Sequence, residues 1–255
     1  MEISLFLMVV IVLIAFVCEY TDSTLGMGYG TTLSPFLLLM GFEPLQVVPV
    51  VLFSELITGA MAGICHHREG NVDFRDQNNR RIVSVFAIGG VVGTLLAVLI
   101  ALNIPKFYLQ VYIGVLVTGL GAFMLAARRW QFFLSWKKII AVGFLASFNK
   151  GISGGGYGPL VCSGQILSGV QPKSAVAITS VAESFTCLIA ILAYFCMSDK
   201  AVDWQLLPYI VGGAVLSVPF SAKSVKWIKE DKFKMCVACA TLLLGIFCLA
   251  KAFWC

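Results

Sequence analysis

The chain has 255 residues, of which 59% are hydrophobic and only 12% are charged, with a net charge of +5 and a mean hydropathy of +0.93. A soluble domain carries about 25% charged residues, so this composition excludes an ordinary water-soluble protein. The positive charge lies in the connections between apolar segments, which relates it to orientation in a membrane and not to nucleic-acid binding.

Long apolar segments follow one another along the chain. They are Ile3–Val17, Val47–Ile64, Ile82–Leu102, Phe107–Ala127, Ala175–Met197, Trp204–Phe220 and Phe233–Trp254. Several reach or approach the roughly 20 residues with which a helix crosses a hydrocarbon core of about 30 Å. Strand-like alternation is absent and the runs are too long for barrel strands. The sequence therefore predicts an all-α polytopic membrane protein, whose first partner is the lipid bilayer.

An internal duplication relates the two halves of the chain. A shift of 128 residues aligns residues 26–55 with residues 154–183 without a gap, and nine of the thirty positions are identical. The identities are Gly26/Gly154, Gly28/Gly156, Tyr29/Tyr157, Gly30/Gly158, Leu39/Leu167, Gly41/Gly169, Pro44/Pro172, Val48/Val176 and Glu55/Glu183. Chance apolar similarity would not supply so many Gly, Tyr, Pro and Glu matches. We expect one integrated domain of two repeats, residues 1–128 and 129–255, with the seam near Arg128–Lys138.

Basic residues in short connections indicate how the chain is threaded through the membrane. They gather in three places: Arg68, Arg75, Arg80 and Arg81; Arg128, Arg129, Lys137 and Lys138; and Lys223, Lys226, Lys229, Lys232 and Lys234. All three face the cytoplasm if each half crosses five times, with the short stretches Gly28–Gly41 and Tyr157–Gly169 counted as crossings. The prediction is a multi-pass protein of the cytoplasmic (inner) membrane with about ten transmembrane segments, arranged as two inverted five-segment repeats. Both termini are expected outside, and the oligomeric state is left open, a homodimer included.

A glycine-rich break precedes a short apolar stretch in each half. The glycines are Gly26, Gly28 and Gly30 in the first repeat and Gly154, Gly155, Gly156 and Gly158 in the second. So many glycines cannot hold a regular helix, and Pro159 suits the first turn of a new one. We expect broken helices whose second halves begin near Tyr29 and Tyr157. Gly-interrupted segments at matching positions of inverted repeats mark the binding sites of secondary transporters.

Two helix N-termini that meet inside the membrane would offer N–H groups and partial positive charge to a small oxyanion. Side chains beside the breaks could add neutral donors: Tyr29, Thr31, Thr32, Asn149, Ser153 and Tyr157. The alternative is that the glycines serve only close helix packing.

Ionisable residues also fall within or beside the apolar segments, where each charge costs at least ~2.5–3.5 kcal/mol. They are Glu19, Asp22, Glu55, Lys150 and Glu183. Lys150 takes the repeat position of Asp22 and could neutralise an anionic cargo, or else pair with Glu19 or Asp22. The carboxyls are candidates for proton coupling. The equivalent Glu55 and Glu183 could instead be protonated groups bonded to backbone at the breaks.

The second break and the segment after it resemble a known family. Within Asn149–Glu183, a Gly-Gly-Gly-Tyr-Gly-Pro motif is followed a dozen residues on by Gly-x-x-Pro and an apolar helix. This pattern resembles the sulfite exporter TauE/SafE family, also known as the toluene-sulfonate uptake permeases, over nearly the whole chain in layout. The resemblance is weaker in the first copy, where Met27 and Thr31 replace the Gly and Pro of the second.

The repeats predict a secondary transporter that works by alternating access, the buried carboxyls indicate protons as the coupling ion, and the resemblance adds the cargo. It implies sulfite, thiosulfate or a small organosulfonate, exported or imported. A passive anion channel of the same architecture is the alternative. Neither a cofactor nor a metal is expected.

An enzymatic interpretation is weaker. The segment Gly151–Gly155 fits the G-x-S-x-G pattern of serine hydrolases, but Ser153 would need a base. The two histidines, His66 and His67, are expected in a solvated cytoplasmic loop, so an intramembrane hydrolase is disfavoured and no catalytic residue is expected. Cys162 follows the second break; packing is the favoured interpretation of this thiol and contact with cargo the alternative.

Overall fold

The chain folds into helices that follow its apolar segments. The computed structural model describes residues 5–126, 136–167, 170–197, 202–225, 227 and 230–254. These residues form α1 (Leu5–Leu25), α2 (Tyr29–Leu39), α3 (Pro44–Arg68), α4 (Gln77–Asn103), α5 (Lys106–Ala126), α6 (Trp136–Ser153), α7 (Tyr157–Leu167), α8 (Pro172–Met197), α9 (Leu207–Ser224) and α10 (Glu230–Trp254). Every predicted apolar segment overlaps one of these helices, so the all-helical prediction is confirmed for the described residues.

The helices have the length and surface of a multi-pass membrane protein. Within the described residues, five helices are long and apolar enough to cross a membrane: α1, α3, α4, α8 and the Lys106–Phe123 part of α5. Large apolar side chains also face outward, with Ile88 73% and Leu216 62% exposed. A surface of this kind suits contact with lipid tails.

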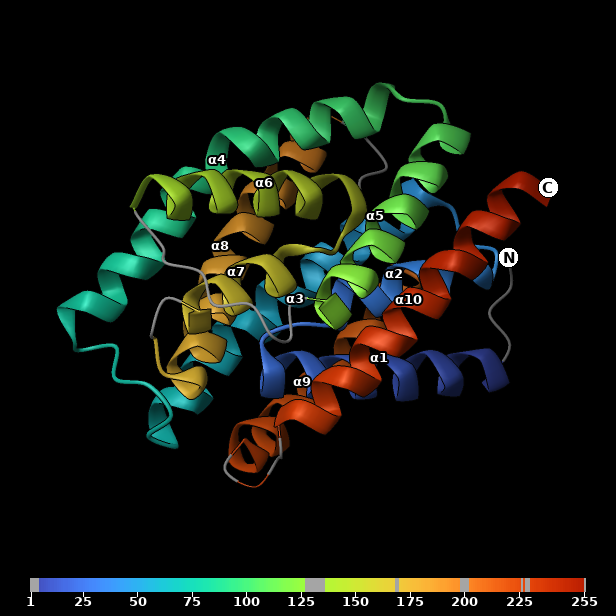
Figure 1. Cartoon of the computed structure of the whole chain (residues 1–255). Coiled ribbons are helices and arrows are strands. Elements are labelled where there is room, and N and C mark those ends of the chain that lie inside the picture. Colours follow the sequence, from blue (N-terminus) through green and yellow to red (C-terminus); the bar gives the residue numbers. More distant parts are fainter. Residues whose placement is uncertain are drawn as a thin grey trace.

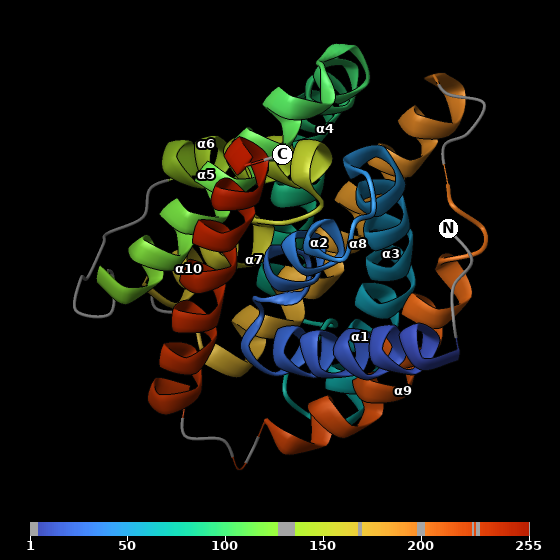
Figure 2. The same cartoon turned by 90° about the vertical axis from the view of Figure 1, so that its right-hand side faces the viewer.

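The contacts between the two halves come in matching pairs. α1 packs on α9 as α6 packs on α4, and α3 packs on α9 as α8 packs on α4. The other extensive contacts, α3 with α8 and α5 with α10, join helices that occupy the same place in the two halves. α1 and α6 run in opposite directions in both views (Figure 1, Figure 2). The seam near Arg128–Lys138 lies largely outside the described residues, as does Gly169.

α2 and α7 are half-length helices. They begin at Tyr29 and Tyr157, which confirms the starts predicted from the sequence. Each has 11 residues, or about 16 Å, roughly half of a hydrocarbon core. Each is therefore too short to span such a core upright by itself, and the count of ten crossings stays a prediction. α2 turns back against α1 (Figure 1, Figure 2), so the two helices form a hairpin and not one straight interrupted helix.

The two ends of the molecule are distinct. The start of α1 and the end of α10 lie at one end, on the right of Figure 1, which we call the terminal face. The connection between α3 and α4, residues 69–76, lies at the opposite end, which we call the loop face. At the terminal face Lys251 Nζ donates to the Leu38 carbonyl oxygen, 2.8 Å away, and ties α10 to the end of α2.

Candidate functional site

The two glycine breaks have matching backbones. Gly26 and Gly28 have φ angles of 70° and 133°, and their counterparts Gly154 and Gly156 have 73° and 84°. These left-handed values strain any residue with a Cβ atom, which explains why glycine stands at each position. Glycine at these positions therefore permits the backbone bends that end α1 and α6.

The breaks also cross each other in direct backbone contact. A Cβ atom at Gly30 would collide with the carbonyl group of Gly154, and one at Gly158 would collide with that of Gly26. A Cβ at Gly155 would lie 2.7 Å from the carbonyl carbon of Gly30. The start of α2 thus rests on the second break, and the start of α7 rests on the first. The helix N-termini meet as expected, and in this state Gly30, Gly155 and Gly158 also serve close packing.

The N-terminus of α2 is already occupied by a carboxyl group. The Tyr29 N–H donates to Asp22 Oδ1 at 3.2 Å, so an acid of α1 caps the next helix. The Tyr29 hydroxyl lies 2.7 Å from Ser54 Oγ on α3. Thr31, expected as a donor, uses its hydroxyl on the Gly28 carbonyl oxygen at 3.2 Å. Tyr29 and Thr31, two of the predicted neutral donors of the first break, therefore have partners within the protein.

The second break is held by Ser153 and Asn149. Ser153 Oγ donates to the Asn149 carbonyl oxygen at 2.7 Å and accepts from the Gly155 N–H at 3.1 Å. The Asn149 side-chain oxygen accepts from the Tyr112 hydroxyl at 2.7 Å. Tyr157, at the start of α7, is completely buried. These contacts fix the end of α6, which carries Lys150.

Lys150 lies between two glutamates that occupy equivalent positions in the repeats. Its Nζ forms an ion pair with Glu183 Oε1 at 2.7 Å and a second with Glu55 Oε2. The side chains of Lys150, Glu55 and Glu183 are 1%, 4% and 6% exposed, respectively. The pairing with Glu19 or Asp22, considered from the sequence, is therefore wrong as to the partners. The structure joins α6, α3 and α8 through this triad.

Carboxyl groups outnumber the lysine around the triad. Glu19 accepts from Ser23 Oγ at 2.6 Å and from Thr58 Oγ1 at 3.0 Å. A small cavity of about 10 Å³, room for roughly one water, joins the acids; it is lined by Glu19, Asp22, Glu55, Thr58, Gly59, Ser180 and Glu183. Four carboxyl groups therefore lie around one buried ammonium group. Uncompensated buried charge is costly, so the contacts with Lys150, Ser23 and Thr58 are needed to hold these acids inside the protein.

Two hydroxyl groups of α3 near the cluster were not predicted from the sequence. Thr58, a partner of Glu19, lies one turn beyond Glu55, and Ser54, the partner of the Tyr29 hydroxyl, lies just before it. The alignment that ended at Glu55 and Glu183 continues with Thr58 opposite Thr186, which is a further identity. That match was the available signal for Thr58. Ser54 has Ala182 as its counterpart, so the repeat gave no indication of it.

One of the two histidines is buried, contrary to the prediction. His66 and His67 belong to the last turn of α3, and His66 is completely buried, which corrects the expectation of a solvated loop for this residue. Its Nε2 lies 2.8 Å from the Ser23 carbonyl oxygen. α3 continues past the apolar run, and its last turn packs on the end of α1. Ser153 Oγ, the nucleophile of the hydrolase interpretation, has backbone partners instead of a histidine.

Cys162 packs against the first break. Its Sγ lies 3.3 Å from the Leu25 carbonyl oxygen, and a Cβ at Gly26 would lie 2.6 Å from the same sulfur. Ser34 is the counterpart of Cys162 in the first repeat and faces Gly154 in the same way. The thiol therefore fills the crossing of the breaks, as the packing interpretation expects.

The chain is similar to known membrane transporters. The family model described as "Sulfite exporter TauE/SafE" matches residues 11–248. The chain is also 27% identical over 228 residues to the "Probable membrane transporter protein YtnM" of Bacillus subtilis (strain 168), which covers 84% of this chain and 73% of that protein. No solved structure gives a significant match.

Proposed function

Because the chain belongs to the sulfite exporter TauE/SafE family, we propose that this multi-pass membrane transporter moves a small sulfur-containing anion across the cytoplasmic membrane, coupled to protons. Sulfite, thiosulfate and small organosulfonates are the cargoes that fit. The observation that carries the proposal is the position of Lys150, buried between Glu55 and Glu183 where the breaks cross.

The triad supplies a physical reason for coupling anion and proton. A cargo anion that binds Lys150 must displace at least one carboxylate from the ammonium group. The displaced glutamate, still buried and now without a counter-charge, is stable only when it takes up a proton. Anion binding and proton uptake thus become one event. Asp22 and Glu19, joined to the triad through the small cavity, extend the proton path.

The same residues suit alternating access. Glu55 comes from α3 of the first repeat and Glu183 from α8 of the second, so each repeat supplies one competitor for the same lysine. If the repeats are inverted across the membrane, loss of one pair frees one face and loss of the other pair frees the opposite face. The first break and the second break then act as matched hinges around a fixed lysine. The basic residues favour a cytoplasmic loop face.

The test is flux of radiolabelled sulfite into proteoliposomes under an imposed pH gradient. Wild-type protein should concentrate sulfite only with the gradient, and Lys150→Ala should reduce that flux at least about tenfold, because the charged contacts it removes are worth ~1.5–3 kcal/mol each. Lys106→Ala is the matched control. Lys106 also forms an ion pair, at 2.6 Å with Glu43, but both partners are more than half exposed. Its removal should leave flux unchanged.

Other outcomes separate the parts of the proposal. Flux of an organosulfonate without flux of sulfite would keep the transporter and replace the cargo. Sulfite flux that ignores the pH gradient and follows only its own concentration gradient would favour the passive channel.

A further inference from the structure

Two hydrogen bonds outside the triad obey the same 128-residue relation as the breaks. His66 Nε2 contacts the carbonyl oxygen of Ser23 at 2.8 Å, and Tyr194 Oη donates to that of Gly151 at 3.1 Å. Tyr194 is the counterpart of His66, and Gly151 that of Ser23. In each repeat the last part of the long helix is therefore tied to the helix that ends at the break, by different side chains.

The two contacts lie toward opposite faces. His66 is in the last turn of α3, beside the α3–α4 connection at the loop face. Tyr194 is three residues before the end of α8, which starts at the loop face and runs away from it. Each is 11 residues beyond its glutamate, or about 16 Å along the helix. One of the two side chains thus lies on each side of the triad.

The contact at the loop face is part of a larger network. Asn71 Nδ2 lies 3.0 Å from His66 Nδ1 and donates to the Ala222 carbonyl oxygen of α9 at 2.9 Å. Since an amide nitrogen only donates, His66 accepts at Nδ1 and donates from Nε2 to Ser23. Ser174 Oγ of α8 donates to the Asn71 carbonyl oxygen at 3.3 Å. His66 and Asn71 together tie α1, α3, α8 and α9.

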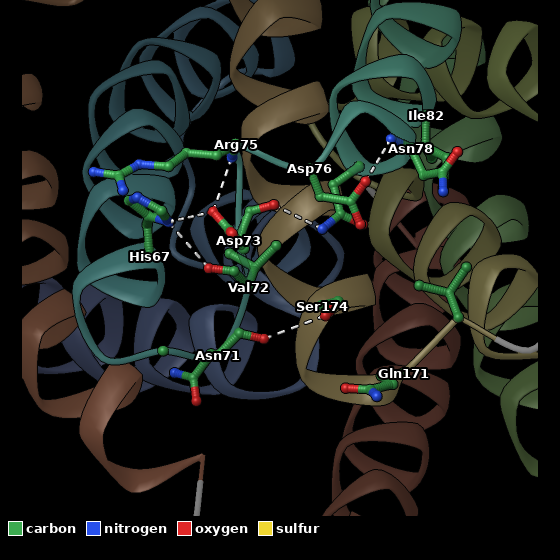
Figure 3. A pocket seen from close by; sticks show the side chains of 13 residues that line it. His67, Asn71, Val72, Asp73, Arg75, Asp76, Asn78, Ile82, Gln171 and Ser174 are labelled. Carbon is green, nitrogen blue, oxygen red and sulfur yellow. Dashed lines mark hydrogen bonds and ion pairs between the residues drawn. The ribbon is translucent and has the colours of Figure 1, made fainter.

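An open cavity begins directly outside this network. It measures about 750 Å³ and its lining includes His67, Asn71, Asp73 and Ser174 (Figure 3). Ser180, which lines the inner cavity of the carboxyls, is six residues beyond Ser174 on α8, about 9 Å along the helix. The network therefore stands between a vestibule at the loop face and the buried acids.

We propose that His66 and Tyr194 are matched positioning residues that determine which face of the transporter is closed. His66, through Asn71, holds the loop face shut, and Tyr194 holds the terminal face shut. The inference rests on the proposed alternating access, and it adds the residues that set the balance between the two open states. Because the loop-face network has more bonds than the single Tyr194 contact, its loss has the larger effect.

Substitution of both residues by phenylalanine gives a matched pair. His66→Phe and Tyr194→Phe keep a ring in each place, make the equivalent positions identical and remove only polar contacts. Each lost hydrogen bond shifts an equilibrium by roughly two- to tenfold. Cys187 serves as a native reporter, since it is completely buried, beside Thr186 on α8. Its alkylation by a membrane-impermeant maleimide is followed by peptide mass spectrometry, with reagent added to one side of oriented vesicles and a C-terminal tag identifying the terminal face.

His66→Phe should raise Cys187 alkylation from the loop face by about tenfold, and Tyr194→Phe should raise it from the terminal face by roughly threefold. Asn71→Ala, a second variant of the loop-face network, should act from the same side as His66→Phe. An increase from the same side in both phenylalanine variants, equal increases from both sides, or no change in either would overturn the proposal. The assay needs no cargo, so failure of sulfite flux and failure of this inference are separate results.

Discussion

The first and second breaks share a backbone and differ in charge. Gly26 N–H donates to the Asp22 carbonyl oxygen at 2.6 Å, and Gly154 N–H donates to that of Lys150 at 2.9 Å. The side chains at these equivalent positions do different things. Asp22 stays within its repeat and caps α2, whereas Lys150 reaches glutamates of both repeats. The two breaks therefore share the backbone geometry of the crossing, but the opposite charges at this position give them different contacts.

This difference assigns separate roles to the two breaks. A carboxylate at a helix N-terminus is stabilised by the N–H groups it caps, so Asp22 has a structural reason to be there. Lys150 lies in the last turn of α6, where the helix dipole also favours a cation. That effect is small, and the two glutamates account for the burial of its ammonium group. Substitutions at the glycines can therefore test the shared backbone, and substitutions at the ionisable residues can test the charges.

The largest effect is expected where the breaks touch. Gly30→Ala and Gly158→Ala place Cβ atoms into opposing backbone, so each should lower the free energy of unfolding by about 3 kcal/mol or more, or prevent folding. Gly119→Ala is the control, since a Cβ at this position in α5 meets no atom within 4 Å. It should be neutral or stabilise by up to about 1 kcal/mol. Thermal unfolding in detergent compares the three. A Gly30→Ala protein as stable as the control would contradict the observed crossing.

Removal of the shared lysine should come next. Lys150→Met leaves Glu55 and Glu183 buried without a counter-charge, which should destabilise the protein by about 3–5 kcal/mol. Addition of Glu55→Gln and Glu183→Gln to the same chain removes the orphaned charges and should recover most of the melting temperature. Sulfite flux should stay absent in both variants. Recovered flux in the triple variant would show that Lys150 has only a structural role.

Some of these features could be predicted from the sequence and others could not. The starts of α2 and α7 were predictable because glycine at left-handed φ and a following helix are local properties. Glu19, Asp22, Glu55, Lys150 and Glu183 were found because a charge in or beside an apolar run is conspicuous. The partners of Lys150 were not found, because Glu55 and Glu183 meet it only when α3, α8 and α6 pack together. The hairpin of α1 and α2 and the burial of His66 likewise depend on tertiary contacts that no local pattern encodes.

The two glutamates offer a sharper comparison, since they compete for one lysine. Glu55→Gln and Glu183→Gln each keep the shape and the other ion pair, and each should reduce flux driven by a pH gradient by roughly tenfold to a hundredfold. Similar losses are expected because the positions are equivalent. Flux should be measured against internal and external pH for both variants. A full loss in one variant beside wild-type coupling in the other would show that a single repeat carries the proton.

Asp22 should give the smallest change and so separates capping from charge. Asp22→Ala removes the acceptor of the Tyr29 N–H and should lower the free energy of unfolding by about 1–2 kcal/mol, the usual loss for an N-terminal cap. Asp22→Asn keeps a side-chain oxygen for that N–H and should retain most of this stability. If Asp22 also belongs to the proton path, Asp22→Asn will reduce coupling while its melting temperature stays near that of the wild type. If its only role is to cap α2, the two substitutions will rank in the same order by flux and by melting temperature, with asparagine close to the wild type in both.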